Sequence, residues 1–263
     1  MSQSEKLKSI LTEIGRAAVT LSGGVDSSYL AYIAKEVLGN NVCAVTFSSP
    51  LLPAREKFEA EEIAGYIGIN HELIDLDELT EEKFSKNPND KCYICKMMRL
   101  KSVSSWAKER DIIWILDGSN IDDLSDYRPG MKALREFPNV RSPFLEAGMD
   151  KEEIRKLAKL SGLSVWNKPA AACLASRISG EQFITMQNLK QVEDAEEFLY
   201  TMLPRYIQLR VRHHVQTARI EVDKSHMGEI INNSGKIMNY FKKIGFKYVA
   251  LDLSGYQRGS IND

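Results

Sequence analysis

The chain has 263 residues, of which 43% are hydrophobic and 27% are charged, and its formal net charge is −1. This length predicts one large domain or two unequal ones, and no apolar run reaches the roughly 20 residues of a membrane-spanning helix. Residues 166–263 hold 13 Lys and Arg against 10 Asp and Glu, which is not the strong basic excess that non-specific nucleic-acid binding requires. The N-terminus lacks the apolar core of a signal peptide, so we expect a cytoplasmic protein. The lack of a long apolar run and of a basic excess argues against a membrane or nucleic-acid partner.

Short apolar runs alternate with amphipathic segments along the first half of the chain. Continuous apolar runs of this kind are typical of parallel strands that are buried on both faces. The alternation predicts a doubly wound parallel α/β sheet with right-handed crossovers, whose ligands bind beyond the carboxyl ends of the strands. The predicted strands span 17–21, 42–47, 73–75 and 112–116.

A second, smaller α/β domain is expected after this sheet. Asp150 and Glu153 have the spacing of a capping box, and they predict a helix that runs to about Ser161 with Gly162 as its C-cap glycine. The irregular stretch that follows places the domain boundary at 163–170. We therefore expect a larger α/β domain at 1–165 and a smaller domain at 166–263, whose helices and strands are predicted at 181–203, 206–212, 217–222, 224–244 and 248–253.

The first predicted strand is followed by the sequence Ser-Gly-Gly-Val-Asp-Ser, residues 22–27. Gly23 and Gly24 allow positive φ and a close approach of the backbone to a ligand, and the following helix offers N–H groups to an anion. Ser22 and Ser27 can donate hydroxyl hydrogen bonds, whereas Asp26 repels phosphate and therefore predicts a magnesium role. The structural alternative is a tight turn with serine caps. The loop matches neither the Walker nor the Rossmann glycine motif.

This hexapeptide resembles the PP-loop of GMP synthetase, NAD synthetase and tRNA-thiolating enzymes. The resemblance implies that ATP is cleaved between its α and β phosphates, and that the loop holds pyrophosphate while an acceptor oxygen takes AMP. The segment 116–120 is similar to the second nucleotide-contacting segment of these enzymes. It implies nucleotide contacts from Gly118, Ser119 and Asn120, although a plain glycine turn is the alternative.

Three of the four cysteines are candidates for sulfur chemistry, whereas Cys43 lies in an apolar run and is predicted to pack in the core. Cys92 and Cys95 open a helical segment, where two thiols point the same way and gain thiolate character from the helix dipole. They can form a redox pair, half of a zinc site, or two ligands of an iron–sulfur cluster. Cys173 is the remaining soft ligand, or else a small residue in an Ala-rich linker. Three thiolates can hold a [4Fe-4S] cluster and leave one iron open for sulfur.

From the PP-loop almost to its C-terminus the chain resembles the LarE family, the sulfur transferases of nickel-pincer nucleotide biosynthesis. The resemblance implies that a carboxylate of pyridinium-3,5-biscarboxylic acid mononucleotide is adenylated and then attacked by sulfur to give a thiocarboxylate. Some members sacrifice one cysteine, and others carry three cysteines and are associated with a [4Fe-4S] cluster. The segments that carry the resemblance are 117–120, 126–133, 166–168, 173–177, 209–213, 218–221 and 248–255.

The three cysteines place this chain with the cluster-bearing members of that family, with Cys92, Cys95 and Cys173 as the cluster ligands. Without a cluster, Cys173 is the candidate sacrificial donor. Ser176 and Arg177 lie close to Cys173 in the sequence and are expected at the reacting centre. The expected cofactors are thus ATP, Mg²⁺ bound by Asp26, and a [4Fe-4S] cluster, with sulfide or another sulfur donor as a partner.

Arginines alternate along two predicted strands of the second domain. Arg210 and Arg212 project from the same face of one strand, because side chains alternate along a strand. Adjacent guanidiniums favour an anion between them, and Arg suits bidentate phosphate binding. The LarE resemblance favours the substrate phosphate over a solvated face with a glutamate counter-ion. The expected substrate contacts are Arg128, Arg210, Arg212, Glu221 and Arg258, although Gln257 holds the place where the family has an arginine.

Two other functions stay open at this point. A tRNA-thiolating PP-loop enzyme shares the ATP chemistry but predicts a basic RNA-binding surface, for which the charge count gives little support. A nucleotide-binding regulator would bind ATP without releasing pyrophosphate and AMP. The LarE resemblance also implies a homo-oligomer.

Overall fold

The structure is a computed structural model that describes residues 2–124, 129–180, 182–204 and 206–257. It divides into two compact units, one of Met1–Leu76 with Cys92–Lys168 and one of Asp77–Lys91 with Pro169–Asp263. Residues 77–91 lie on the N-terminal side of the predicted boundary, yet they belong to the second unit. Asn87 Nδ2 donates a hydrogen bond to Ser179 O at 2.7 Å, and Ile184 N donates to Ser85 O at 2.8 Å.

The first unit is built on a parallel five-stranded sheet, which confirms the predicted doubly wound α/β class. The strand order is β3-β2-β1-β4-β5. From the central strand β1, the chain adds β2 and β3 on one side, and then adds β4 and β5 on the other side of β1. A sheet of this kind binds ligands where the strand order reverses, here at the carboxyl ends of β1 and β4. The strands are β1 (Ala17–Thr20), β2 (Val42–Ser48), β3 (Asn70–Asp75), β4 (Trp114–Leu116) and β5 (Val140–Arg141).

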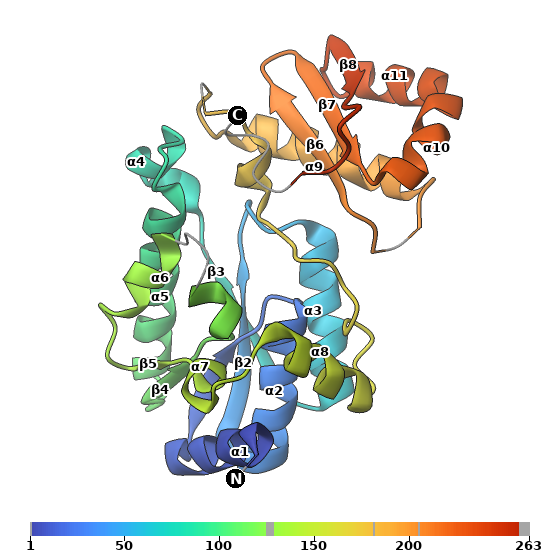
Figure 1. The fold of residues 1–263 in the computed structure, drawn as a ribbon. Helices are drawn as coiled ribbons and strands as arrows, with labels where there is room; N and C mark the ends of the chain where they lie inside the picture. Colours follow the sequence, from blue (N-terminus) through green and yellow to red (C-terminus); the bar gives the residue numbers. More distant parts are fainter. Residues whose placement is uncertain (1, 125–128, 181, 205, 258–263) are drawn as a thin grey trace. The chain divides into compact units, whose positions relative to one another are not determined.

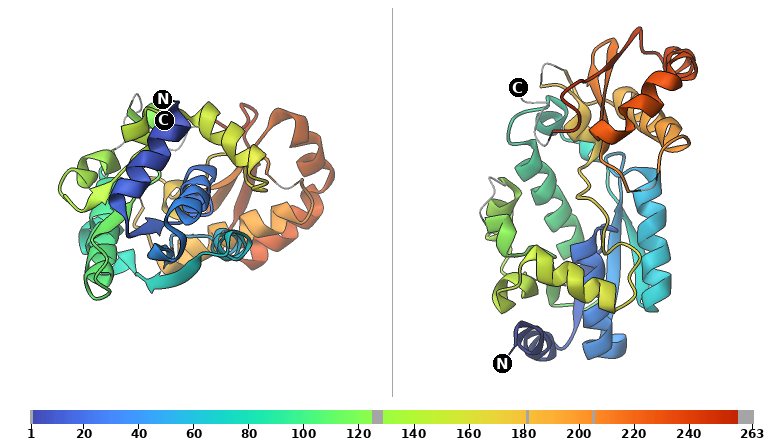
Figure 2. Two further views of the ribbon diagram at one scale, coloured as in Figure 1. Left: turned by 90° about the horizontal axis from the view of Figure 1, so that it is seen from below. Right: turned by 45° about the vertical axis from the view of Figure 1, so that its right-hand side comes forward.

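Helices cover both faces of this sheet (Figures 1 and 2). Ala17 and Val19 point into a core shared with α1, α2, α3, α7 and α8, whereas Ala18 points to the opposite face and packs with Val103 and Trp106 of α5. This alternation along β1 explains why its sequence is apolar throughout. The helices of this unit are α1 (Gln3–Ile14), α2 (Val25–Leu38), α3 (Ala54–Ile67), α5 (Lys91–Lys108), α6 (Pro129–Leu134), α7 (Pro143–Ala147) and α8 (Lys151–Leu160).

The helix predicted after Asp150 is present as α8. Asp150 caps it by accepting a hydrogen bond from Glu153 N at 2.9 Å, and Gly162 follows its end with φ of 73°. By contrast, β5 has only two residues, too few to give a periodic signal in the sequence, and it was not predicted.

The second unit has its own sheet and core. Strand β6 (Leu209–His214) pairs antiparallel with β7 (Thr217–Val222), which pairs parallel with β8 (Tyr248–Leu251). A helix was predicted at 181–203, but α9 spans Met186–Tyr200 because a capping box between Thr185 and Asn188 sets its start. The remaining helices are α4 (Glu82–Ser85), α10 (Met227–Asn232) and α11 (Ser234–Lys243), and the 3₁₀ turns of the two units are Gly39–Asn41, Glu78–Thr80, Ile121–Leu124, Leu174–Arg177 and Lys224–His226.

Across the described residues, no helix combines the length and the apolar character needed to cross a membrane.

Candidate active site

The predicted phosphate loop connects β1 to α2 at the switch point of the sheet. Gly24 is the N-cap of α2, and no side chain caps the helix there, so its first N–H groups are left for an anion. Ser27 Oγ accepts a hydrogen bond from Ser22 N at 3.1 Å and lies 3.0 Å from Ser22 Oγ. The two serines therefore close the loop on itself and keep their hydroxyls together at the helix start.

Two glycines allow the close contacts that this loop makes. Gly23 has φ of 73°, and a Cβ there would lie 3.1 Å from Glu56 O in α3. Gly118 lies in the loop after β4, and a Cβ on it would lie 3.1 Å from Ser27 N. A side chain at either position would push the loop away from its neighbour, since carbon contacts normally lie at about 3.5–4.0 Å.

The loop after β4 is held by a partly buried ion pair. Lys96 Nζ of α5 lies 2.6 Å from Asp117 Oδ2, and Ser119 donates both its N–H and its hydroxyl to Asp117 Oδ1. Burial by itself raises the pKa of the Asp117 carboxyl, but the Lys96 ammonium and the hydrogen bonds from Lys96 and Ser119 outweigh it and hold the pKa below its usual value. Asp117 therefore stays ionised and fixes this loop against the phosphate loop.

The Asp26 carboxylate faces the same region. It accepts hydrogen bonds from Asn120 Nδ2 and from Lys151 Nζ, each at 3.2 Å. Its side chain is 23% exposed and lines the cavity described next. An accessible carboxylate beside a phosphate site fits Mg²⁺, which binds through one or two carboxylates together with substrate phosphate oxygens and water.

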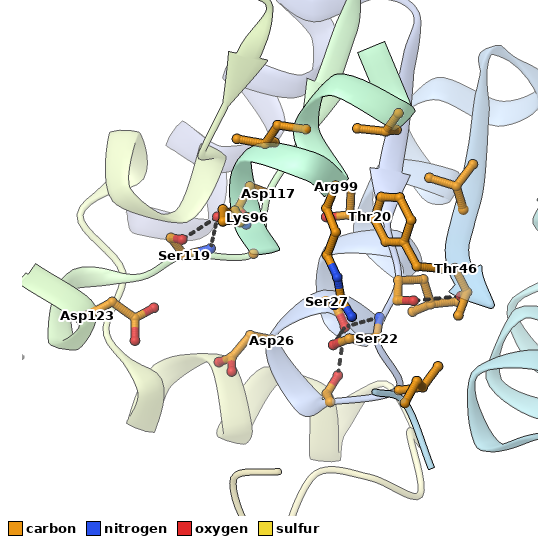
Figure 3. Close-up of a pocket in the computed structure, with 18 residues that line it drawn as sticks. Thr20, Ser22, Asp26, Ser27, Thr46, Lys96, Arg99, Asp117, Ser119 and Asp123 are labelled. Carbon is orange, nitrogen blue, oxygen red and sulfur yellow. Dashed lines mark hydrogen bonds and ion pairs between the residues drawn. The ribbon is translucent and has the colours of Figure 1, made fainter. Parts of the chain in front are cut away.

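These residues surround a cavity of about 310 Å³ in the first unit (Figure 3). Arg99 extends from α5 towards Ser22 and Ser27, with its guanidinium carbon 5.4 Å from the centre of the Phe47 ring. The lining thus combines an apolar part with hydroxyls, two cations and three carboxylates. The lining residues are Thr20, Leu21, Ser22, Gly24, Asp26, Ser27, Val45, Thr46, Phe47, Leu52, Lys96, Arg99, Leu100, Val103, Asp117, Gly118, Ser119 and Asp123.

A buried lysine supports the phosphate loop from the side of α3. Lys168 Nζ lies 2.5 Å from Glu56 Oε2 and 2.6 Å from Glu59 Oε2, and it donates to Gly23 O at 3.1 Å. All three charged side chains are less than 8% exposed. Lys168 is also the last residue of the first unit, so the chain leaves this unit directly beneath the loop.

In the second unit, Cys173 begins a short 3₁₀ turn and is half-buried. Ser176 Oγ donates to Cys173 O at 2.7 Å, and Arg177 Nη1 donates to the same oxygen at 2.8 Å. Arg177 is also paired with Glu196, with Nε 3.0 Å and Nη2 3.2 Å from its two carboxylate oxygens. The predicted neighbours Ser176 and Arg177 are thus brought to Cys173, where they hold its backbone.

The predicted arginine face is present on β6 and β7. Arg212 and Arg219 both pair with Glu221, at 2.8 and 3.0 Å, and Glu221 is fully buried. Arg210 donates instead to the carbonyls of Leu209 and Ala170, at 2.6 and 3.1 Å. Within the described part of the chain, no carboxylate forms an ion pair with Arg210. Burial lowers the pKa of Arg210, and the neighbouring Arg177 lowers it further, so this part of the face favours an added anion.

The three candidate cluster cysteines are divided between the two units. Cys92 is exposed and Cys95 is half-buried in the first turn of α5, whereas Cys173 belongs to the second unit. Of the residues that the structure describes, no three His, Cys, Asp or Glu side chains form a group that could hold a metal ion. The predicted substrate residues Arg128 and Arg258 lie outside the described residues.

Four basic residues at or below the cavity were not predicted, namely Lys96, Arg99, Lys151 and Lys168. Lys96 follows Cys95 directly, and Lys168 ends the segment 166–168 that carries part of the family resemblance, but the sequence alone assigns neither residue a role. Their partners lie 21 residues or more away in the chain. Local spacing therefore cannot identify these contacts.

Comparison with known proteins gives matches along the whole chain. A family model described as NAD synthase matches residues 3–105. The chain is 34% identical to pyridinium-3,5-bisthiocarboxylic acid mononucleotide synthase of Lactiplantibacillus plantarum, over 98% of this chain and 92% of that protein. It is 38% identical to an uncharacterised Synechocystis protein, over 99% and 97% respectively. The similarity to one component of the glutamine-hydrolysing GMP synthase of Archaeoglobus fulgidus is lower, at 26% over 73% of this chain and 66% of that protein.

Proposed function

The chain belongs to the LarE family of PP-loop enzymes, and on this premise we propose that it thiolates a carboxylate of pyridinium-3,5-biscarboxylic acid mononucleotide after activating it with ATP. The observation that carries the proposal is the cavity at the carboxyl ends of β1 and β4, which places an uncapped helix start and a hydroxyl pair beside cationic side chains. That combination suits a bound triphosphate. The name of the L. plantarum relative gives a bisthiocarboxylic acid as its product, and we infer the corresponding carboxylic acid as the acceptor here.

The first step proposed is adenylation. A carboxylate oxygen attacks the α-phosphorus of ATP, the bond between that phosphorus and the bridging oxygen breaks, and pyrophosphate leaves. The N–H groups at the start of α2, with Ser22 and Ser27, would hold the departing pyrophosphate, and Lys96 and Arg99 would offset negative charge within the cavity. Such a step depends mainly on positioning and on fixed charges, because the protein forms no covalent bond.

Magnesium would be held by Asp26, whose carboxylate lines the cavity and is accessible. It would supply a positive charge shared between the protein and the phosphate oxygens. Asn120 orients the Asp26 carboxylate through the hydrogen bond to Oδ1, and Lys151 holds the other oxygen. Lys151 would therefore also offset the negative charge of Asp26 when no metal is bound.

The second step proposed is attack of sulfur on the acyl carbon of the mixed anhydride, which expels AMP and leaves a thiocarboxylate. A carboxylate needs this activation, because its own oxygen is a poor leaving group. Cys173 is proposed as the sulfur-handling residue, with Ser176 and Arg177 fixing its turn. Arg210 and Arg212 are proposed to bind the substrate phosphate, and Arg210 is supported by its lack of an acidic partner among the described residues.

Two sources of sulfur are compatible with the cysteines. In one, Cys92, Cys95 and Cys173 would hold a [4Fe-4S] cluster, as the three-cysteine pattern of the family favours. Among the described residues, no three His, Cys, Asp or Glu side chains already form such a group. In the other, Cys173 gives up its own sulfur and becomes dehydroalanine. Iron content together with the mass of Cys173 distinguishes the two sources.

The proposal is tested by offering the full chain ATP, Mg²⁺ and a sulfur source with either the pyridinium mononucleotide or a tRNA pool. Formation of AMP and pyrophosphate with the mononucleotide, together with a thiocarboxylate product, supports it. Thiolated RNA would show instead that the chain is a tRNA-modifying enzyme. A chain that binds ATP but releases neither AMP nor pyrophosphate with any acceptor is a nucleotide-binding regulator.

The sulfur source is tested on the same reaction. Anaerobic reconstitution, followed by iron and sulfide quantification, compares the wild type with Cys92→Ala. Less iron in the variant supports the cluster, whereas equal iron in both excludes Cys92 as a ligand. A protein that becomes lighter by the mass of H₂S during turnover, with the loss located at Cys173 by peptide mass spectrometry, identifies Cys173 as the sacrificed donor.

A further inference from the structure

The peptide between Gly23 and Gly24 is held in a fixed orientation by Lys168. Lys168 Nζ donates to Gly23 O at 3.1 Å and is itself fixed by Glu56 and Glu59 of α3. We propose that Lys168 is a positioning residue that aims the Gly24 N–H into the cavity for pyrophosphate to accept. This inference rests on the proposed function of the cavity and assigns to Lys168 a role in anion binding without contact to the ligand.

The geometry of the peptide bond carries the first step of the argument. The described residues contain no cis peptide bond, and in a trans peptide the C=O and the following N–H point in opposite directions. Lys168 holds Gly23 O on the side of α3, against which Gly23 packs. The Gly24 N–H is therefore directed away from α3, to the side on which Gly24 lines the cavity.

Glycine on both sides of this peptide explains why it needs such a restraint. Gly23 has φ of 73° and Gly24 has φ of −83°, and glycine adopts either sign of φ at little cost. The two residues can therefore rotate their shared peptide more easily than any other pair in the loop. A reversed peptide would present Gly23 O to a bound anion, and a carbonyl oxygen repels phosphate.

Burial and charge make Lys168 suited to this task. One lysine faces two carboxylates, so the three buried side chains of Lys168, Glu56 and Glu59 have a formal net charge of −1, which the partly exposed Arg55, 4.0 Å from Glu56, offsets. Because this arrangement brings no net positive charge beneath the anion site, electrostatic attraction does not explain it. The two carboxylates instead keep the ammonium fixed beneath Gly23 O, because they accept two of its three N–H groups and leave the third for that carbonyl.

The backbone of Lys168 is fixed as well. Arg155 Nη1 donates to Trp166 O at 2.6 Å, and Arg155 Nη2 donates to Lys168 O at 2.7 Å. These bonds attach the segment 166–168 to α8, so the lysine side chain extends from an anchored backbone. The orientation of the Gly23–Gly24 peptide is thus set by α3 and α8 together.

The test measures pyrophosphate and AMP binding to the full chain by calorimetry in the presence of Mg²⁺. Lys168→Met removes the contact to Gly23 O and changes the formal charge of the buried group from −1 to −2. Lys168→Met combined with Glu59→Gln also removes the contact but restores −1. Glu59→Gln alone keeps the contact, and Lys156→Met, an exposed lysine of α8, is the matched control for the loss of a lysine.

We expect roughly 10- to 100-fold weaker pyrophosphate binding in both Lys168 variants, the range for one lost hydrogen bond to a charged group. AMP binding should change less than about twofold, because the misdirected N–H faces the departing phosphates. Lys156→Met should bind pyrophosphate as tightly as the wild type, and Glu59→Gln should weaken binding less than either Lys168 variant, because Glu56 and Gly23 O still hold the ammonium. The double variant keeps the comparison valid if Lys168→Met alone does not fold.

Two results overturn the inference. One is wild-type pyrophosphate affinity in the double variant, and the other is a parallel loss of pyrophosphate and AMP affinity, which a general loosening of the site would cause. A wild-type protein that binds neither ligand would overturn the proposed function of the cavity and this inference with it. Wild-type binding therefore decides the proposed function independently of the Lys168 variants.

Discussion

Replacing Gly118 with alanine places a methyl group against the first turn of α2. The added Cβ would lie 3.1 Å from Ser27 N and 3.3 Å from Ser27 Cα, where ordinary contacts lie at about 3.5–4.0 Å. Both neighbours are backbone atoms, so the loop after β4 must move by a few tenths of an ångström. Gly118→Ala should therefore separate the two loops that form the nucleotide cavity without removing any charged group.

The cost follows from the size of this overlap. Overpacking by one methyl group costs about 1–3 kcal/mol, and if this strain falls on the nucleotide-bound arrangement, it weakens ATP binding roughly 5- to 150-fold. Calorimetric titration of the full chain with ATP measures the effect. Gly65→Ala is the matched control: it lies within α3, its Cβ would meet nothing within 4 Å, and alanine is the better helix former.

We expect unchanged ATP affinity and unchanged or higher stability for the Gly65 variant. Wild-type ATP affinity in Gly118→Ala would refute the close approach of the two loops as a requirement for binding. An equal loss of affinity in both variants would also refute it, because Gly65 makes no contact with the cavity.

Three further substitutions test other parts of the structure. Lys96→Met removes the ammonium that holds the pKa of Asp117 down, so the rate of pyrophosphate release should fall roughly tenfold. Lys101 is exposed on the same helix, and Lys101→Met should leave this rate unchanged. Burial lowers the pKa of His71, so below about pH 6.5 the unfolded chain binds more protons than the folded chain. The melting temperature should therefore decrease as the pH is lowered through this range, and His71→Gln should make that decrease smaller. Arg177→Met leaves a buried carboxylate unpaired, which should lower the free energy of unfolding in urea by about 3–5 kcal/mol.

The parts of the site that were predicted from the sequence are those whose information is local. The phosphate loop is six consecutive residues between an apolar strand and a helix, so its position followed from pattern alone. The alternation of Arg210 and Arg212 likewise predicted a shared face, because β6 is a regular strand. The ion pair of Arg212 with Glu221 was harder to predict, since Glu221 lies on the neighbouring strand and its full burial depends on packing.

The parts that were not predicted depend on contacts between distant segments. Lys168 meets Glu59 across 109 residues and Gly23 across 145, and no spacing rule joins such positions. Residues 77–91 pack with the second unit through hydrogen bonds such as that from Asn87 to Ser179. Propensity identifies a turn at Asn87, which has φ of 56°, but it does not identify the segment against which that turn packs.

The most direct test of the proposed reaction follows the oxygen atoms of the substrate carboxylate. Pyridinium-3,5-biscarboxylic acid mononucleotide labelled with ¹⁸O in its carboxylates is incubated with the full chain, ATP, Mg²⁺ and a sulfur source, and the products are analysed by mass spectrometry. If the carboxylate attacks the α-phosphorus and sulfur then displaces AMP, one ¹⁸O atom appears in each AMP and the other stays in the thiocarboxylate. AMP without label beside a thiocarboxylate, or label in pyrophosphate, would contradict the account.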